Sequence, residues 1–190
     1  LTLRSGTLAA ALAANAVVCS FRWGDPYRLC VVQSIRFQFQ TLTLFTAAQL
    51  VNFGFDAFTA RLFSAPHTGG TPATMTGNSA KTRTEMGEML QNDFRISSTA
   101  ALAGGGGLVL DALPFAQSLG DQQRVNPAAP TEEQRVNDPT LEWKCDVASG
   151  EAPLVYALNE GFVIRNRTLW PAAGTGIIQA TVRWTECMEY

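Results

Sequence analysis

Metal binding and thiol chemistry would both depend on the four cysteines of the chain, Cys19, Cys30, Cys145 and Cys187. None of them belongs to a C-x-x-C pair, the spacing typical of zinc sites. The single histidine, His67, lies in a Thr/Gly/Pro-rich stretch, where we expect an exposed loop. A serine nucleophile would need a positioned base, and no other candidate base stands out. We therefore expect no enzyme, no catalytic residues, no metal site and no cofactor.

The spacing of Cys19 and Cys30 allows one further possibility. They flank the turn-forming residues 23–26, which read Trp-Gly-Asp-Pro. A hairpin centred on residues 24–25 would place the two cysteines directly opposite each other, at a separation that a disulfide can span. The alternative is a pair of buried thiols close in space, and we favour this alternative.

Other patterns indicate chemistry less well. Residues 77–82 resemble a phosphate-binding loop, but Ala80 stands where that motif has glycine. Glu132 and Glu133 are adjacent acids in a polar stretch, which are normally only solvated. Asn166 begins an Asn-Arg-Thr glycosylation sequon, which matters only in a eukaryotic secretory pathway.

Aromatic residues alternate with polar ones in two stretches, at Phe37 and Phe39 and again at Phe53 and Phe55, and Arg36 lies among them. Aromatic side chains interleaved with arginine can form a stacking platform for single-stranded nucleic acid. The same pattern is typical of strand residues that face a core, and we expect the core.

The length and amino-acid composition of the chain indicate one folded domain. The chain has 190 residues, of which 46% are hydrophobic and 16% charged, with a net charge of −2. This is enough apolar surface for a core and too little charge for a disordered chain. The slight acidity argues against general binding to nucleic acid or to an anionic membrane.

The elements that must position these residues are strands. From Ile178 to Trp184 the apolar residues fall at every second position, which is the period of a half-buried strand. Upstream, residues 153–158 and 162–166 are apolar runs separated by Asn-Glu-Gly, which predicts a hairpin whose last loop residue is left-handed.

Further strand patterns cover residues 16–23, 28–44, 51–63, 94–98 and 108–115, with one helical turn expected at residues 46–49. About eight strands and almost no helix predict an all-β fold, an antiparallel two-sheet sandwich of jelly-roll type. A closed barrel and an immunoglobulin-like sandwich are the alternatives.

The same sequence patterns indicate the domain organisation. Residues 1–15 are Ala- and Leu-rich and predict an extended N-terminal arm, with a secretory signal as the less favoured interpretation. Residues 16–190 form the sandwich. Within it, residues 117–150 carry three prolines and many polar residues, so we expect a long surface excursion there.

Several strand sequences resemble those of a family of tailed-phage virion structural proteins. The resemblance is carried by PLVYALNEGFVIRN at 153–166, PAAGT at 171–175 and VRWTE at 182–186. It continues in SFRW at 20–23, IR at 35–36, FTAAQ at 45–49, FDAFTAR at 55–61 and FRI at 94–96. It extends over most of the chain and thins out between residues 117 and 150.

The resemblance implies a capsid decoration or cement protein that binds the major capsid protein on the exterior of the virion, assembled in the bacterial cytoplasm. It further implies a homotrimer. The alternatives are a tail, baseplate or head–tail connector protein and, from another class, a carbohydrate-binding or host-recognition module. The arm and the excursion are the expected contact regions, which suggests as contact residues Leu1, Leu3, Leu8, Leu12, Arg124 and Arg135.

Overall fold

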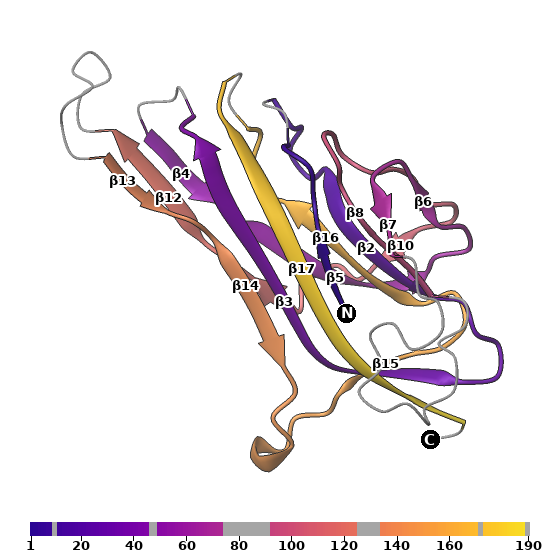
Figure 1. Ribbon diagram of the computed structural model, residues 1–190. Coiled ribbons are helices and arrows are strands. Elements are labelled where there is room, and N and C mark those ends of the chain that lie inside the picture. The colour runs from indigo at the N-terminus through magenta and orange to yellow at the C-terminus, as the bar shows by residue number, and fades with distance from the viewer. Residues whose placement is uncertain (9–10, 46–48, 74–91, 125–133, 171–172, 189–190) are drawn as a thin grey trace.

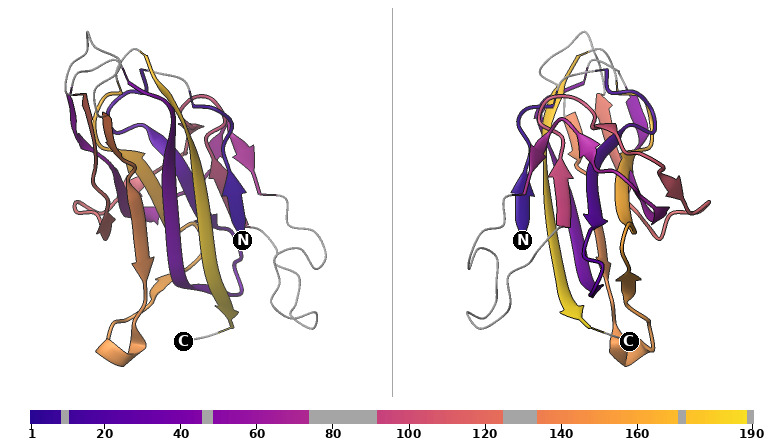
Figure 2. Two further views of the ribbon diagram at one scale, coloured as in Figure 1. Left: turned by 60° about the vertical axis from the view of Figure 1, so that its left-hand side comes forward. Right: turned by 90° about the vertical axis from the view of Figure 1, so that its right-hand side faces the viewer.

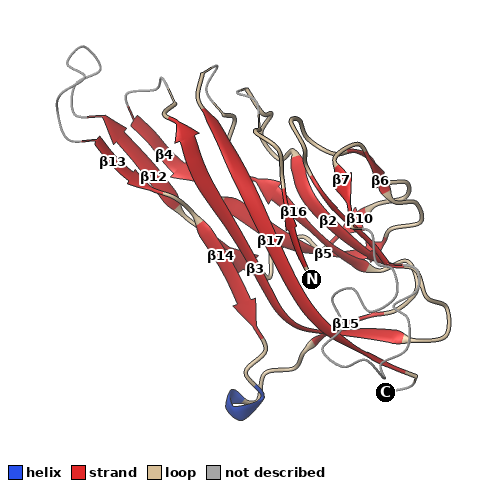
Figure 3. Cartoon of the chain, viewed as in Figure 1, coloured by secondary structure: helices blue, strands red, loops and turns tan. Residues whose placement is uncertain are grey.

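Two antiparallel β-sheets pack face to face in the computed structural model of the chain (Figure 1). The structure describes residues 1–8, 11–45, 49–73, 92–124, 134–170 and 173–188. Within that part the regular structure is strand, apart from one short 3-10 helix, η1 (Val147–Ser149), drawn in blue in Figure 3. The predicted all-β, two-sheet antiparallel sandwich is confirmed.

Sheet A is built on a long central pair of strands. Its order is β1 (Thr2–Arg4), β17 (Thr175–Cys187), β3 (Leu29–Thr43) and β14 (Thr140–Lys144), and β15 (Leu154–Tyr156) also pairs with β3. In β3 the apolar residues Ile35, Phe37 and Phe39 alternate with polar ones and are buried, as predicted. The same alternation buries Ile178, Ala180 and Val182 of β17.

Sheet B forms the second layer. Its order is β10 (Val109–Leu110), β5 (Phe55–Leu62), β16 (Gly161–Asn166), β2 (Val17–Trp23), β8 (Asn92–Ile96) and β7 (Thr71–Pro72), and β11 (Ala116–Gln117) also pairs with β5. Two smaller sheets complete the fold. One joins β13 (Gln134–Asn137), β12 (Gly120–Arg124) and β4 (Gln49–Phe53), and the other joins β6 (His67–Thr68) and β9 (Ala103–Gly104).

Aromatic rings fill the space between the two sheets. Phe37 of sheet A meets Phe55 of sheet B edge-on, with ring centroids 4.7 Å apart. Trp184 of β17 meets Phe21 of β2 in the same way at 5.5 Å. Such edge-to-face pairs stabilise a core beyond the area that they bury. Figure 2 shows the layers from two further sides.

A second, smaller core covers the outer face of sheet B. Phe63 and Leu102 pack there against Val17, Ala60 and Val163, which point away from sheet A. We call residues 63–72 and 97–110 the covering segments. Because they lie on this face, β2 and β16 are buried on both sides. Sheet A has exposed polar side chains on its own outer face.

The N-terminal segment belongs to the sandwich, so the expectation of a separate arm was wrong. β1 pairs with β17 through Thr2 to Arg4. Beyond it, the Leu8 amide donates to the Gly176 carbonyl at 2.8 Å. Leu8 and Leu12 are buried in the main core. An apolar segment with an unpaired sheet edge beside it gains both backbone hydrogen bonds and burial by adding to that edge.

The predicted hairpin between Cys19 and Cys30 does not form. β2 lies in sheet B, where Cys19 faces Ile164 and Ile96 on its two neighbours. β3 lies in sheet A, where Cys30 faces Tyr156 and Glu186. Since β2 is hydrogen-bonded on both edges, it has no edge free for β3. The intervening residues 24–28 cross between the sheets, and Trp23 Nε1 donates to the Arg28 carbonyl at 2.6 Å.

Residues 153–166 are also a crossing between sheets rather than a hairpin. β15 pairs with β3 in sheet A, and β16 pairs with β2 and β5 in sheet B. The left-handed residue of the connection is Asn159, with φ 65°, and not Gly161. Gly161 is needed because a Cβ there would lie 1.9 Å from the Phe21 carbonyl oxygen.

Residues 117–124 and 134–150, the described part of the expected surface excursion, contribute strands to the sheets, and residues 125–133 lie outside the described residues. β14 is paired along its length with β3, and its Leu141 is fully buried. β12 and β13 form a hairpin that continues the strand ladder through β4 (Figure 1). The strand predicted at 51–63 is divided at Gly54, and the helical turn at 46–49 falls largely outside the described residues.

Candidate functional site

The cysteines and the histidine do not come together. Cys19 and Cys30 are buried free thiols in different sheets, and burial raises the pKa of both. Cys145 and Cys187 are free and partly exposed. Among the residues that the structure describes, no three His, Cys, Asp or Glu side chains are grouped to hold a metal ion.

His67 is buried, so the expectation of an exposed loop histidine was wrong. His67 belongs to one of the covering segments. Its side chain is 2% exposed and packs against Phe63. Gly105 packs on the ring so closely that a Cβ there would lie 2.7 Å from Nε2. Burial lowers the pKa of His67, and Arg165 and Arg95 lower it further. A neutral imidazole in this position stabilises the fold and is not accessible to a substrate.

The sequon asparagine is also buried. Asn166 is fully covered, and its amide nitrogen donates to the carbonyls of Ala13 and Thr168, at 2.7 and 2.8 Å. These bonds tie the N-terminal segment to the end of β16. The side chain therefore has a structural role inside the fold and is not exposed as a glycan acceptor.

The aromatic residues of the candidate nucleic-acid platform are core residues, as expected. Phe37, Phe39, Phe53 and Phe55 are all nearly or fully buried between the sheets. A base could not stack on them, and the stacking interpretation was wrong. The phosphate-loop pattern at 77–82 and the acidic pair Glu132 and Glu133 lie outside the described residues.

The predicted contact residues have different positions from those expected. Leu8 and Leu12 are buried in the chain's own core, and Leu1 and Leu3 pack against that core partly buried. These leucines are therefore satisfied within the molecule and are not a free apolar arm. Arg124 and Arg135 belong to β12 and β13, where the backbone register places Gln123 opposite Arg135 and Arg124 opposite Gln134.

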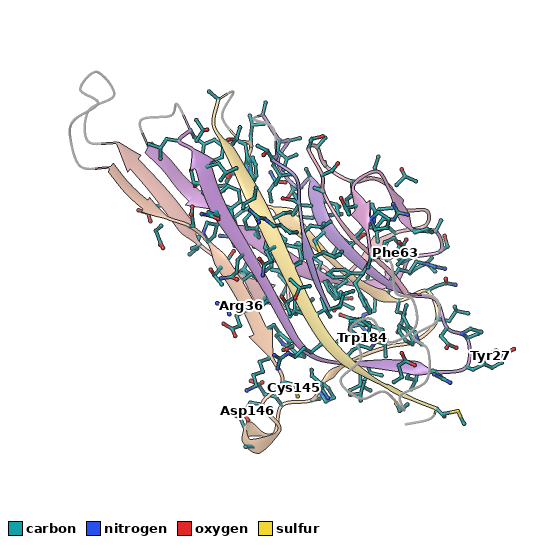
Figure 4. All side chains as sticks on the ribbon, in the orientation of Figure 1. Tyr27, Arg36, Phe63, Cys145, Asp146 and Trp184 are labelled. Atoms are coloured by element: carbon teal, nitrogen blue, oxygen red, sulfur yellow. The ribbon has the colours of Figure 1, made fainter. Side chains whose placement is uncertain are left out.

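An exposed apolar surface lies at one end of the sandwich. Three separate segments meet there and present Tyr27 (82% exposed), Met188 (76%) and Leu158 (44%). They line a groove of about 430 Å³ together with Pro26 and Ala157. Tyr27 marks this end in Figure 4. We call it the apolar end. Sequence alone did not indicate it, because the three residues lie far apart along the chain.

The outer face of sheet A is polar and shallowly hollowed. A depression of about 360 Å³ is lined by Arg4 of β1, Gln179 of β17, Gln38 of β3 and the nearby Asp138. The Asp138 carboxylate accepts hydrogen bonds from the Thr41 amide and hydroxyl at 3.0 and 2.6 Å. The depression is lined by amides and charged groups that suit hydrogen bonding, and no pair of acid and base is positioned there for catalysis.

No protein-family model, curated protein or solved structure matches the chain. The described part of the chain contains no helix with the length and apolar character needed to cross a bilayer. The apolar end and the outer face of sheet A are therefore the candidate functional surfaces, and both are suited to contact with another molecule.

Proposed function

We propose that the protein is a structural component of a tailed-phage virion, a decoration protein that binds the major capsid protein lattice from outside. The observation that carries this proposal is the apolar end. Large apolar side chains that converge from separate segments on an exposed groove are typical of a protein–protein contact. Tyr27, Met188 and Leu158 still expose apolar surface at this groove, and a bound partner would remove it from water.

The strand framework supports the same proposal. The sequences that resemble virion proteins include parts of β2 and β16, in the middle of sheet B, and of β17, inside sheet A. A decoration protein has to present a rigid surface to a lattice, and a sandwich with both sheets tied by long-range pairing provides one. Residues 2 and 181, at opposite ends of the sequence, are cross-strand partners. A homotrimer at a local three-fold position of the lattice remains our expectation for its assembly.

The test is binding to particles assembled without this gene product. Purified protein should co-sediment with such particles, and image reconstruction should show added density on the capsid exterior. Density on the tail or baseplate would contradict the decoration role, and absence of co-sedimentation would contradict the virion role altogether.

One double variant and one control variant locate the contact. Tyr27→Ala combined with Met188→Ser should weaken co-sedimentation by about tenfold or more, because exposed aromatic anchors dominate such contacts. Leu113→Ala is the matched control, since Leu113 is 80% exposed but lies in the connection between β10 and β11. Equal binding by the double variant and the control would remove the apolar end from the interface.

A further inference from the structure

Four cations from four different strands share the outer face of sheet A. Arg183 of β17 and Lys144 of β14 stand on either side of Ser34, and Arg36 is the next outward residue of β3. Arg4 of β1 lies beside Gln179, one outward residue further along. All four cationic side chains are exposed. Arg36 is labelled on this face in Figure 4. We call these residues the basic face.

The register shows that these side chains point the same way. In an antiparallel sheet, directly paired residues project from one face, and residues two apart along a strand do so as well. Thr181, Arg36 and Glu142 form one row across three strands, and Gln179, Gln38 and Thr140 form the next. Their neighbours Ile35 and Phe37 point into the core.

No cation of the basic face forms an ion pair among the described residues, although Glu142 lies directly across from Arg36 in the register. The ion pairs formed by the described residues join Arg28 to Glu186, Arg61 to Asp111, Arg95 to Asp93 and Arg167 to Asp56, and none includes a cation of this face. Glu142 and Asp138 are the carboxylates of the face. Four cations against these two leave +2 here, so with −2 for the whole chain the remainder carries −4.

The groups between the charges form hydrogen bonds and offer little apolar contact. Gln33, Gln40, Gln179 and Thr185 are exposed on this face, and Gln33 Nε2 already donates to Thr185 Oγ1 at 2.9 Å. A partner that covers them must supply polar groups, or it leaves them unpaired at a cost. This requirement separates the basic face from the apolar end.

We propose that the basic face docks on a carboxylate-bearing surface of a partner protein. Unpaired arginines are favoured in interfaces because the guanidinium binds carboxylates in a bidentate manner. Nucleic acid fits less well, because the face includes two carboxylates, its rows contain no exposed aromatic ring for stacking, and the chain is acidic overall. The inference goes beyond the proposed virion role, since it concerns a different surface and the chemistry of its partner.

The test measures binding to poly-L-glutamate, a carboxylate polymer, which needs no virion. Immobilised poly-L-glutamate should retain the wild-type protein at about 50 mM salt and release it as salt rises, because exposed charge pairs are screened. Arg36→Glu and Arg183→Glu should each weaken binding by about three- to tenfold. Single-stranded DNA on the same support serves as the second probe.

Arg61→Glu is the matched control, because it makes the same charge change at an exposed arginine of sheet B. It should weaken binding by less than twofold. The proposal is overturned if poly-L-glutamate does not retain the wild type, or if the three variants behave alike. It is also overturned if DNA is retained more tightly than poly-L-glutamate in a manner that depends on Arg36. Because particles play no part, these outcomes are separate from those that test the decoration role.

Discussion

The ring of His67 packs edge-on against Phe63, with centroids 5.0 Å apart and planes at 74°. The Nδ1 atom of His67 is buried and has no hydrogen-bond partner among the described residues. The charged groups that act on it are Arg165 of β16 and Arg95 of β8, and Arg95 is itself paired with Asp93. A proton added to His67 would therefore be held in an apolar site beside two cations.

This arrangement predicts a loss of stability in mild acid. Burial holds the pKa of His67 below its ordinary value of about 6.5, so its contribution to stability is complete above that pH and is lost as the pH falls below it. Urea titrations at pH 7.5 and pH 5 should show a larger drop in the free energy of unfolding for the wild type than for His67→Gln. Parallel drops in the two proteins would mean that His67 is not responsible.

The N-terminal segment is predicted to stabilise the fold. Leu8 is fully buried in the main core, so Leu8→Ala should lower the free energy of unfolding by about 3 kcal/mol. Leu113→Ala, at an exposed leucine, should change it by less than about 0.5 kcal/mol. Denaturant titration measures both. An unchanged midpoint for Leu8→Ala would indicate that the segment detaches in solution.

The last strand offers a comparison between its two faces. Trp184 is half-buried against Phe21, so Trp184→Ala should cost about 2–3 kcal/mol, somewhat less than a fully buried tryptophan. Thr181 lies on the outer face, where its hydroxyl meets that of Thr2 at 2.9 Å, and Thr181→Ala should cost under about 1 kcal/mol. Equal losses in thermal or chemical unfolding would contradict the observed register.

The thiols should divide into two classes. Burial raises the pKa of Cys19 and Cys30, so neither forms a thiolate readily in the folded protein. Cys145 and Cys187 are partly exposed and should react with a thiol reagent under native conditions, whereas Cys19 and Cys30 should react only after denaturation. Peptide mapping of the labelled protein measures this. A Cys19–Cys30 cross-link in protein aged in air would contradict the separation of β2 and β3.

Strand identity was predictable from sequence where apolar and polar residues alternate clearly, and strand pairing was not. Alternation along β3 and β17 is set by which face is buried, so Phe37 and Val182 could be assigned to the core from local pattern alone. Which strands pair with one another depends on all the strands of a sheet together. A Gly-Asp turn after Trp23 is compatible with a hairpin and with a crossing between sheets. The crossing forms because β16 and β8 occupy both edges of β2.

The candidate surfaces were harder to predict for the same reason. Tyr27, Leu158 and Met188 are separated widely along the sequence, and only the folded chain brings them to one groove. The four cations of the basic face likewise come from four strands that lie far apart in sequence. His67 was assigned to an exposed loop because its neighbours in sequence are small and polar. The residue that packs closely on its ring is Gly105, which is distant in sequence.

The position of β17 at the centre of sheet A has a consequence for biosynthesis. β17 lies between β1 and β3 in the sheet, yet it comes after both of them in the chain. Residues 44–174 separate it from β3. During translation, β1 and one edge of β3 have no partner until β17 leaves the ribosome. Unpaired edges of this kind invite association between nascent chains, and pairing across such long sequence separations is slow. Sheet A therefore closes only after β17 has been synthesised, and the yield of folded protein in a cell should depend on how fast this strand becomes available.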